Sequence, residues 1–269
     1  MIRRVCFLVL MVALVFTTFA QKKITEDKLK AVSGVAIGGQ DQSAEQIKQK
    51  AINDAKINAL KKAGIEENIS SYTDYFRSET EHTMEELFTS DILTNINGTV
   101  KDIELIEAVP TITPEMQIRI DVKINCTVVK YETKKDPSFS AWIENVKKFY
   151  KVGEGMSFTV KPTRDCYIRA FIFTTDSYVL LPNNWEPSTL LQSHTVYTFP
   201  NEDVIGSYEM TIDNPKLDRE TNRLVILLLK QDIYYTGTVN YKDITDWIMS
   251  IPPDERLIES FAYDVFKEK

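Results

Sequence analysis

The sequence predicts an α+β protein. A two-layer α/β domain, with a long helix on a small and mostly antiparallel sheet, is expected to precede an antiparallel β-sandwich or barrel-like domain. Alanines recur at helical spacing between positions 44 and 63, and apolar and polar residues alternate from 116 to 128. The second half is rich in β-branched and aromatic residues between turn signals. The 269 residues are enough for one large or two modest domains.

The first 20 residues have the organisation of a secretory signal peptide. Arg3 and Arg4 precede an apolar stretch from Val5 to Phe16, and the small residues Thr18 and Ala20 come before a polar segment. This pattern predicts cleavage after Ala20. A membrane anchor is the rival interpretation, but the apolar core is shorter than the roughly 20 residues that a spanning helix needs. We therefore expect an exported protein, periplasmic or extracellular, with no membrane span after signal cleavage.

Charge and cysteine placement limit what this protein binds. Cys6 lies early in the apolar stretch rather than after a small residue at its end, so we expect no lipid anchor. Without Arg3 and Arg4, the formal net charge changes from −7 to −9. This acidic balance argues against nucleic-acid and anionic-lipid partners, because basic patches bind such surfaces.

The N-terminal domain is expected at 21–135. Residues 28–38 read as a strand, and a capping box of Ser43 and Gln46 starts a helix that ends at Gly64. The remaining elements are a segment open between strand and helix at 69–78, a helix at 83–96, and strands at 98–109 and 115–130 joined by a turn at 110–114.

Residues 136–150 are expected to form an amphipathic helical connector, because six apolar residues between Phe139 and Tyr150 recur at helical spacing. Its aromatic side would pack between the domains. The alternative is binding to a membrane surface, which the exposed lysines would favour: Lys147, Lys148 and Lys151.

The second domain is expected at 151–269. The run LVILLL at 224–229 is apolar on consecutive positions, so it should be covered on both faces. A helical tail is expected around 244–249, while 254–266 satisfies both helical spacing and alternation and stays open. The expected strands are 156–161, 165–174, 177–181, 195–199, 207–212 and 223–230.

The two cysteines of the mature chain are expected to be buried free thiols. Cys126 and Cys166 each share a strand face with apolar residues, and their strands belong to different expected domains. A disulfide between them is the rival interpretation, since an exported chain meets oxidising conditions.

No familiar catalytic arrangement is found, so we expect no enzyme, no cofactor and no metal site. His82 and His194 each lack a second ligand at metal-binding spacing, and the chain has no Gly-x-Ser-x-Gly motif. The glycines at 153 and 155 precede a strand rather than a helix, unlike a phosphate-binding loop. The alternative is a pair of carboxylates for glycoside hydrolysis among Asp165, Asp176, Glu186, Glu202 and Asp203.

The stretch YVLLPNNWEP, residues 178–187, contains most of the candidate binding residues. It reads as a strand end, because Pro182 lacks an N–H and two asparagines can take the turn. Trp185 is either a staple folded back over the sandwich edge or an exposed stacking platform. The weak candidates for binding are Tyr178, Asn183, Asn184, Trp185 and Tyr197.

Two resemblances bear on these expectations. Residues 28–130, with VSGVAIGG, AINDAKINALKKAG and MQIRIDVKINCTV, resemble the lipoprotein-20 family and the N-terminal domain of the flagellar assembly protein T family. Residues 150–236, with DCYIRAF and YVLLPNN, resemble the bacterial domain of unknown function 4384. The first resemblance implies an envelope domain, and the second implies a β-rich accessory module without assigned chemistry.

These observations predict an exported bacterial cell-envelope accessory protein that acts as a non-enzymatic interaction or assembly module. Its partner would be another envelope protein. The alternative is a module that binds glycan or another cell-wall ligand through exposed aromatic residues, and a third is an unrecognised hydrolase.

Overall fold

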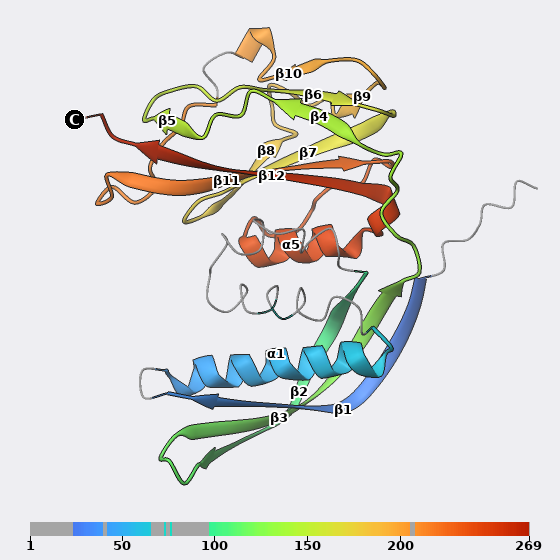
Figure 1. Ribbon diagram of the computed structural model, residues 1–269, viewed down its shortest axis with the longest axis vertical. Helices are drawn as coiled ribbons and strands as arrows, with labels where there is room; N and C mark the ends of the chain where they lie inside the picture. The colour runs from blue at the N-terminus through green and yellow to red at the C-terminus, as the bar shows by residue number, and fades with distance from the viewer. Residues whose placement is uncertain are drawn as a thin grey trace, which may run out of the picture.

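The computed structural model describes residues 24–39, 42–65, 73, 76, 97–204 and 208–268. Within these ranges the chain is a mixed α/β protein, built mostly of strands with two α-helices and three open sheets (Figure 1). The general α+β class predicted from the sequence is therefore found. The expected signal peptide and the expected helix at 83–96 lie outside the described residues.

The N-terminal part is a three-stranded antiparallel sheet with one long helix on it. The strands lie in the order β1 (Ile24–Gly38), β3 (Ile118–Tyr131) and β2 (Gly98–Ile112). Helix α1 (Ala44–Lys62) packs on one face of β1 and β3. The turn between β2 and β3 lies at 113–117, slightly later than predicted, because β2 continues to Ile112.

Helix α1 begins and packs as the sequence predicts. The Ser43 hydroxyl accepts from the backbone N–H of Gln46, and the Ser43 N–H donates to the Gln46 side chain at 2.8 Å. Ala51 and Ala55 are fully buried against the sheet. A Cβ atom added to Gly34 of β1 would lie only 2.2 Å from the Ala51 carbonyl oxygen, so small residues on both elements permit this close contact.

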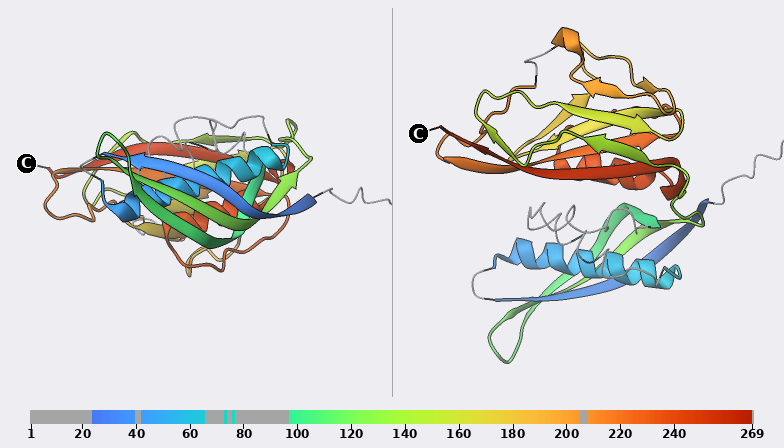
Figure 2. Two further views of the ribbon diagram at one scale, coloured as in Figure 1. Left: turned by 90° about the horizontal axis from the view of Figure 1, so that it is seen from below. Right: turned by 45° about the horizontal axis from the view of Figure 1, so that its top comes forward.

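Two sheets make up the second half and lie one over the other (Figure 2). In the smaller sheet, β6 (Phe158–Pro162) lies between β10 (Tyr197–Phe199) and β4 (Ala141–Glu144). The larger sheet has the order β5 (Phe149–Lys151), β12 (Arg256–Phe266), β11 (Arg219–Leu229), β7 (Cys166–Phe173) and β8 (Ser177–Leu181), with β9 (Leu190–Leu191) paired to β7.

Strand β11 is covered on both faces, which confirms the expectation for the run LVILLL. All six residues from Leu224 to Leu229 are completely buried. Leu224, Ile226 and Leu228 belong to the core between the two sheets. Val225, Leu227 and Leu229 belong to a second core on the opposite face of the larger sheet.

The second core joins the two halves of the chain. Helix α5 (Tyr241–Ser250) lies between the larger sheet and the N-terminal part (Figure 1). Buried residues of α5, β11, α1 and β3 form one continuous apolar cluster. The Tyr131 hydroxyl at the end of β3 also donates to the carbonyl oxygen of Ser250, at 2.7 Å.

The helical connector predicted at 136–150 is wrong. This segment forms the strands β4 and β5. The apolar residues that fit a helical period also fit an alternation, in which Ala141 and Ile143 pack on the core while Trp142 points outward. Pairing of β4 with β6 and the positive φ of Asn145, 71°, oppose a helix here.

Two further segments need comment: for one the structure settles an open alternative, and for the other it differs from the expectation. Residues 254–266, left open between helix and strand, form β12 from Arg256 onward, where eleven residues pair with β11. The helix expected around 244–249 is α5, and a short 3-10 turn, Pro253–Glu255, separates it from β12. The strand expected at 207–212 is reduced, in its described part, to an isolated bridge between Glu209 and Gly155.

Cys126 and Cys166 are both buried free thiols, as the sequence predicts. Burial raises the pKa of Cys126, although Lys62 opposes this, and burial together with Asp165 raises the pKa of Cys166 to about 12. Because the reactive thiolate is disfavoured, we expect neither thiol to react with a thiol reagent at about pH 8 in the folded protein. Both should react in denaturant. Rapid labelling of either cysteine before unfolding, followed by mass spectrometry, would contradict this.

Candidate functional site

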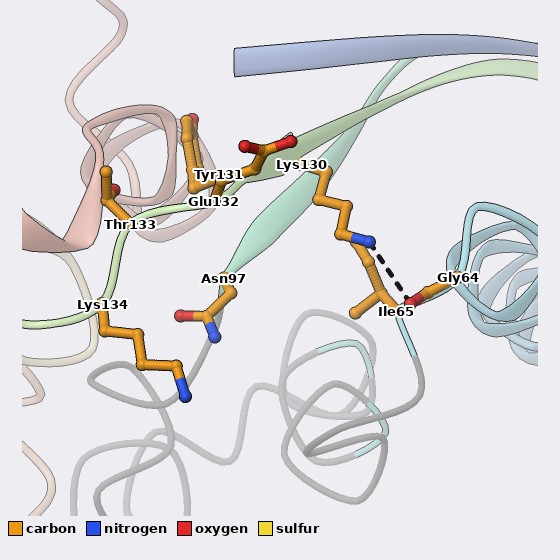
Figure 3. A pocket seen from close by; sticks show the side chains of 8 residues that line it. All are labelled: Gly64, Ile65, Asn97, Lys130, Tyr131, Glu132, Thr133 and Lys134. Carbon is orange, nitrogen blue, oxygen red and sulfur yellow. Dashed lines mark hydrogen bonds between the residues drawn. The ribbon is translucent and has the colours of Figure 1, made fainter. Parts of the chain in front are cut away.

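One surface cavity, of about 450 Å³, lies where β3 leaves the N-terminal sheet. Its walls come from the end of α1, from Asn97 and from residues 130–134 (Figure 3). Lys130 Nζ points to the Gly64 carbonyl oxygen at 3.5 Å. The backbone N–H of Tyr131 donates to the carbonyl oxygen of Asn97 at 2.8 Å.

The Tyr131 hydroxyl links the end of β3 to α5, while Lys130 contacts the end of α1 and the Tyr131 N–H binds Asn97. Burial is the main cause that raises the pKa of Tyr131 to about 12, so its hydroxyl stays protonated and donates to Ser250. The Lys130 ammonium group donates to the carbonyl oxygen of Gly64, just after α1. We therefore assign this cavity to the joining of the two halves rather than to a ligand.

A second cavity lies on the outer face of the smaller sheet. It has a volume of about 340 Å³ and is lined by Trp142, Glu144, Thr159, Lys161 and Val196. We call these five residues the Trp142 face. The alternation of β4 and β6 places Trp142, Glu144, Thr159 and Lys161 outward, because Ile143 and Val160 between them pack on the core.

The strand register arranges the Trp142 face in two rows. Trp142 lies opposite Lys161, and Glu144 lies opposite Thr159. Val196 directly precedes β10, whose first residue, Tyr197, pairs with Val160. One row therefore runs from Val196 across Lys161 to Trp142, and the next row runs across Thr159 to Glu144.

Trp142 is the dominant side chain of this face. It is 58% exposed, and Val196 is 60% exposed. Lys161 Nζ lies 6.0 Å from the centroid of the Trp142 ring, at the outer limit of a cation–π contact. An aromatic ring open to solvent beside charged side chains is a chemistry suited to recognition.

The polar groups of the face are largely free to contact a ligand. Neither Lys161 nor Glu144 forms an ion pair within the part of the chain that the structure describes. The Thr159 hydroxyl accepts from the Asn145 side chain at 3.4 Å, a long hydrogen bond. A cation, a carboxylate and a hydroxyl thus surround one exposed indole.

The residues singled out from the stretch YVLLPNNWEP lie elsewhere. The Asn183 side chain accepts from the N–H groups of Trp185 and Glu186, both at 2.8 Å, and donates to Leu180 at 2.9 Å. This network builds the turn after β8. Asn184 is exposed, and Trp185 is 65% exposed.

The two candidate tyrosines occupy different surroundings. Tyr197 of β10 is half-buried against the core, and its hydroxyl accepts from the backbone N–H of Gln192 at 2.9 Å. Tyr178, at the start of β8, is exposed and donates to Asp213 at 3.2 Å. Trp185 follows the opposite end of β8, so the structure does not gather these rings on one strand end.

The acids considered for hydrolysis are dispersed. Asp165 accepts from the backbone N–H of Ser193 at 2.7 Å. Glu186 is buried and accepts from the backbone N–H of Asn201 at 2.8 Å and from the Tyr208 hydroxyl. Burial, then this hydrogen bond, raise the pKa of Tyr208 well above its usual range. Both carboxylates thus serve to fix loops.

Other candidate groups do not converge either. Asp176 and Glu202 are exposed, and the side chain of Asp203 lies outside the described residues. His194 is exposed in a turn, with a φ of 60°, and His82 lies outside the described residues. In the ranges that the structure describes, no three His, Cys, Asp or Glu residues are placed to hold a metal ion.

Sequence reasoning missed Trp142 as a surface residue. It assigned the tryptophan to the apolar side of a connector helix. The available signal was the alternation of Phe139, Ala141 and Ile143, which leaves position 142 on the other face.

Comparison with known proteins agrees with one of the two resemblances. The family model described as a domain of unknown function, DUF4384, matches residues 149–218. These residues include β6, which supplies Thr159 and Lys161 of the Trp142 face, and Val196, which directly precedes β10. No curated protein matches the chain. The segment 149–218 is thus similar to the DUF4384 family, while Trp142 and Glu144 lie just before the matched region.

Proposed function

We propose that this chain is an exported bacterial cell-envelope protein that acts as a non-enzymatic binding module, with the Trp142 face as its contact surface. One observation carries the proposal: an exposed tryptophan lies over a shallow cavity beside a lysine and a glutamate that have no ion-pair partner in the described residues. Tryptophan is enriched among the residues that contribute most to binding.

The leader supports export. Residues 1–20 combine two arginines, an apolar stretch and small residues before position 21, a pattern that secretion systems recognise and cleave. None of the helices in the described residues is both long and apolar enough to cross a membrane. The protein would act in the periplasm or outside the cell, without a lipid anchor.

The proposed envelope role of the N-terminal domain rests on the sequence resemblance of residues 28–130 to the lipoprotein-20 and flagellar assembly protein T families. We propose that residues 21–135 form this domain, and that the two sheets after residue 135 form a sandwich that presents the Trp142 face.

The roles of Glu186 and Asp165 favour binding over hydrolysis. Glu186 and Asp165 each accept hydrogen bonds from backbone N–H groups of neighbouring loops. A catalytic carboxyl pair would instead flank a cleft at a separation of about 5–10 Å. The proposed partner is therefore bound without being cleaved.

Cross-linking in intact cells tests the proposal. The full chain, with its own leader and a C-terminal tag, is compared with its Trp142→Ala and Trp185→Ala variants. Because both tryptophans are exposed, neither change should unfold the protein, which circular dichroism can check. We expect a cross-linked envelope component that the wild type and Trp185→Ala recover and that Trp142→Ala loses.

Two outcomes would contradict the proposal. One is equal recovery of the component by Trp142→Ala and by the wild type. The other is no recovered component under conditions that preserve known envelope complexes.

A further inference from the structure

We infer that the Trp142 face binds an uncharged sugar ring of a glycan. This inference rests on the proposed function, because it names the ligand class of the same surface. It is argued from the shape of the face, from the balance of its charges and from its hydrogen-bonding groups.

The shape of the face suits a flat ring. The face of an indole carries negative π density, which attracts the positively polarised C–H groups of a saturated ring. Trp142 offers such a surface at the edge strand β4, with 58% of the residue exposed. Val196, at the other end of the same row, adds a second apolar contact.

The size of the face allows more than one ring. Neighbouring strands lie about 4.8 Å apart, so the row from Val196 across Lys161 to Trp142 extends over roughly 10 Å. The cavity of about 340 Å³ is open to solvent on its outer side, and it falls at the small end of known ligand sites. An extended polymer could therefore enter and leave the face at both ends.

The charges of the face cancel. Lys161 contributes one positive and Glu144 one negative charge, and neither has an ion-pair partner in the described part of the chain. An anionic ligand would gain from Lys161 but would be repelled by Glu144, and a cationic ligand would meet the reverse. A neutral ligand meets no such conflict.

The hydrogen-bonding groups fit hydroxyls better than a peptide edge. An ammonium group only donates, a carboxylate only accepts, and the Thr159 hydroxyl does both. Neighbouring hydroxyls of a sugar both donate and accept, so one ring can satisfy all three side chains. A peptide strand would instead pair with backbone groups along the edge of β4, whereas these three side chains point away from the plane of the sheet.

Calorimetric titration with defined saccharides tests the inference. The probes are cellohexaose and chitohexaose as neutral glycans, hexagalacturonate as an anionic glycan, and a soluble muramidase digest of peptidoglycan. The proteins are the wild-type mature chain and its Trp142→Ala, Trp142→Phe, Trp185→Ala, Lys161→Met and Glu144→Gln variants.

We expect at least one neutral probe to bind. Trp142→Ala should weaken that binding at least about tenfold, and Trp142→Phe should restore part of it. Lys161→Met and Glu144→Gln should each weaken binding, while Trp185→Ala, the matched exposed tryptophan, should leave it unchanged.

The results that would overturn the inference differ from those that would overturn the proposed function. Stronger binding of hexagalacturonate than of every neutral probe, or a loss of binding in Trp185→Ala instead of Trp142→Ala, would overturn the sugar assignment. So would the absence of binding to all four probes. If a cross-linked component then still depended on Trp142, the proposed function would stand without a sugar ligand.

Discussion

Replacing Leu227 or Leu228 with alanine is expected to lower the free energy of unfolding by about 2–5 kcal/mol in each case. The two side chains are neighbours in β11, and both are completely buried. Leu227 packs in the core shared with α1 and α5, and Leu228 packs between the two sheets. Because β11 is covered on both faces, shortening a side chain on either face leaves a cavity in a close-packed core and should destabilise the protein.

Denaturant unfolding monitored by circular dichroism measures these effects. Leu217→Ala is the control, because Leu217 is exposed and its truncation should change stability by less than about 0.5 kcal/mol. A small effect of Leu227→Ala together with a large effect of Leu228→Ala would mean that the shared core does not form.

The second large effect is expected from Gly34→Ala. The added methyl group would lie 2.2 Å from the Ala51 carbonyl oxygen and 2.4 Å from the Ala55 nitrogen, both of them backbone atoms of α1. The helix must therefore move away from β1, which should cost about 1–3 kcal/mol or more. Loss of that contact would also weaken two hydrogen bonds to β1, from Val35 to Asp54 and from Asn58 to Ser33.

Gly155→Ala is the matched control for Gly34→Ala. No atom lies within 4 Å of a Cβ placed there, and its φ is not in the left-handed region. This change should be neutral or should stabilise the protein slightly, because alanine restricts the unfolded chain. Equal thermal midpoints for Gly34→Ala and the wild type would show that α1 does not pack closely on β1.

The sequence predicts correctly those elements whose local pattern is compatible with only one type of secondary structure. The capping box at Ser43 and the buried alanines specify α1, and strict alternation from 118 to 128 specifies β3. The run from 224 to 229 needed two covering layers, and the structure provides them.

Some segments could not be assigned from the sequence, because their apolar residues fit both the spacing of a helix and the alternation of a strand. Residues 139–150 fit a helix by spacing, but long-range pairing with β6 decides for β4. Residues 256–266 likewise become a strand because β11 offers an eleven-residue partner. Such pairings join segments that are separated in the chain. A short stretch of sequence does not include the partner strand and therefore cannot predict the pairing.

The Trp142 face could not be predicted from the sequence for the same reason. In a connector helix Trp142 would be buried between domains, whereas in β4 it is exposed next to Lys161. The face comes from β4 and β6, which begin at positions 141 and 158, and from Val196, directly before β10. Only the folded sheet brings them together.

Photo-cross-linking from the surface tests the central claim most directly. A photoreactive aliphatic amino acid is placed at position 196, which lines the Trp142 face and leaves Trp142 in place, or at position 185 of the full chain, and intact cells are irradiated. We expect a cross-linked envelope component, protein or glycan, from position 196 and none from position 185. No component from position 196, or the same component from position 185 alone, would contradict the account.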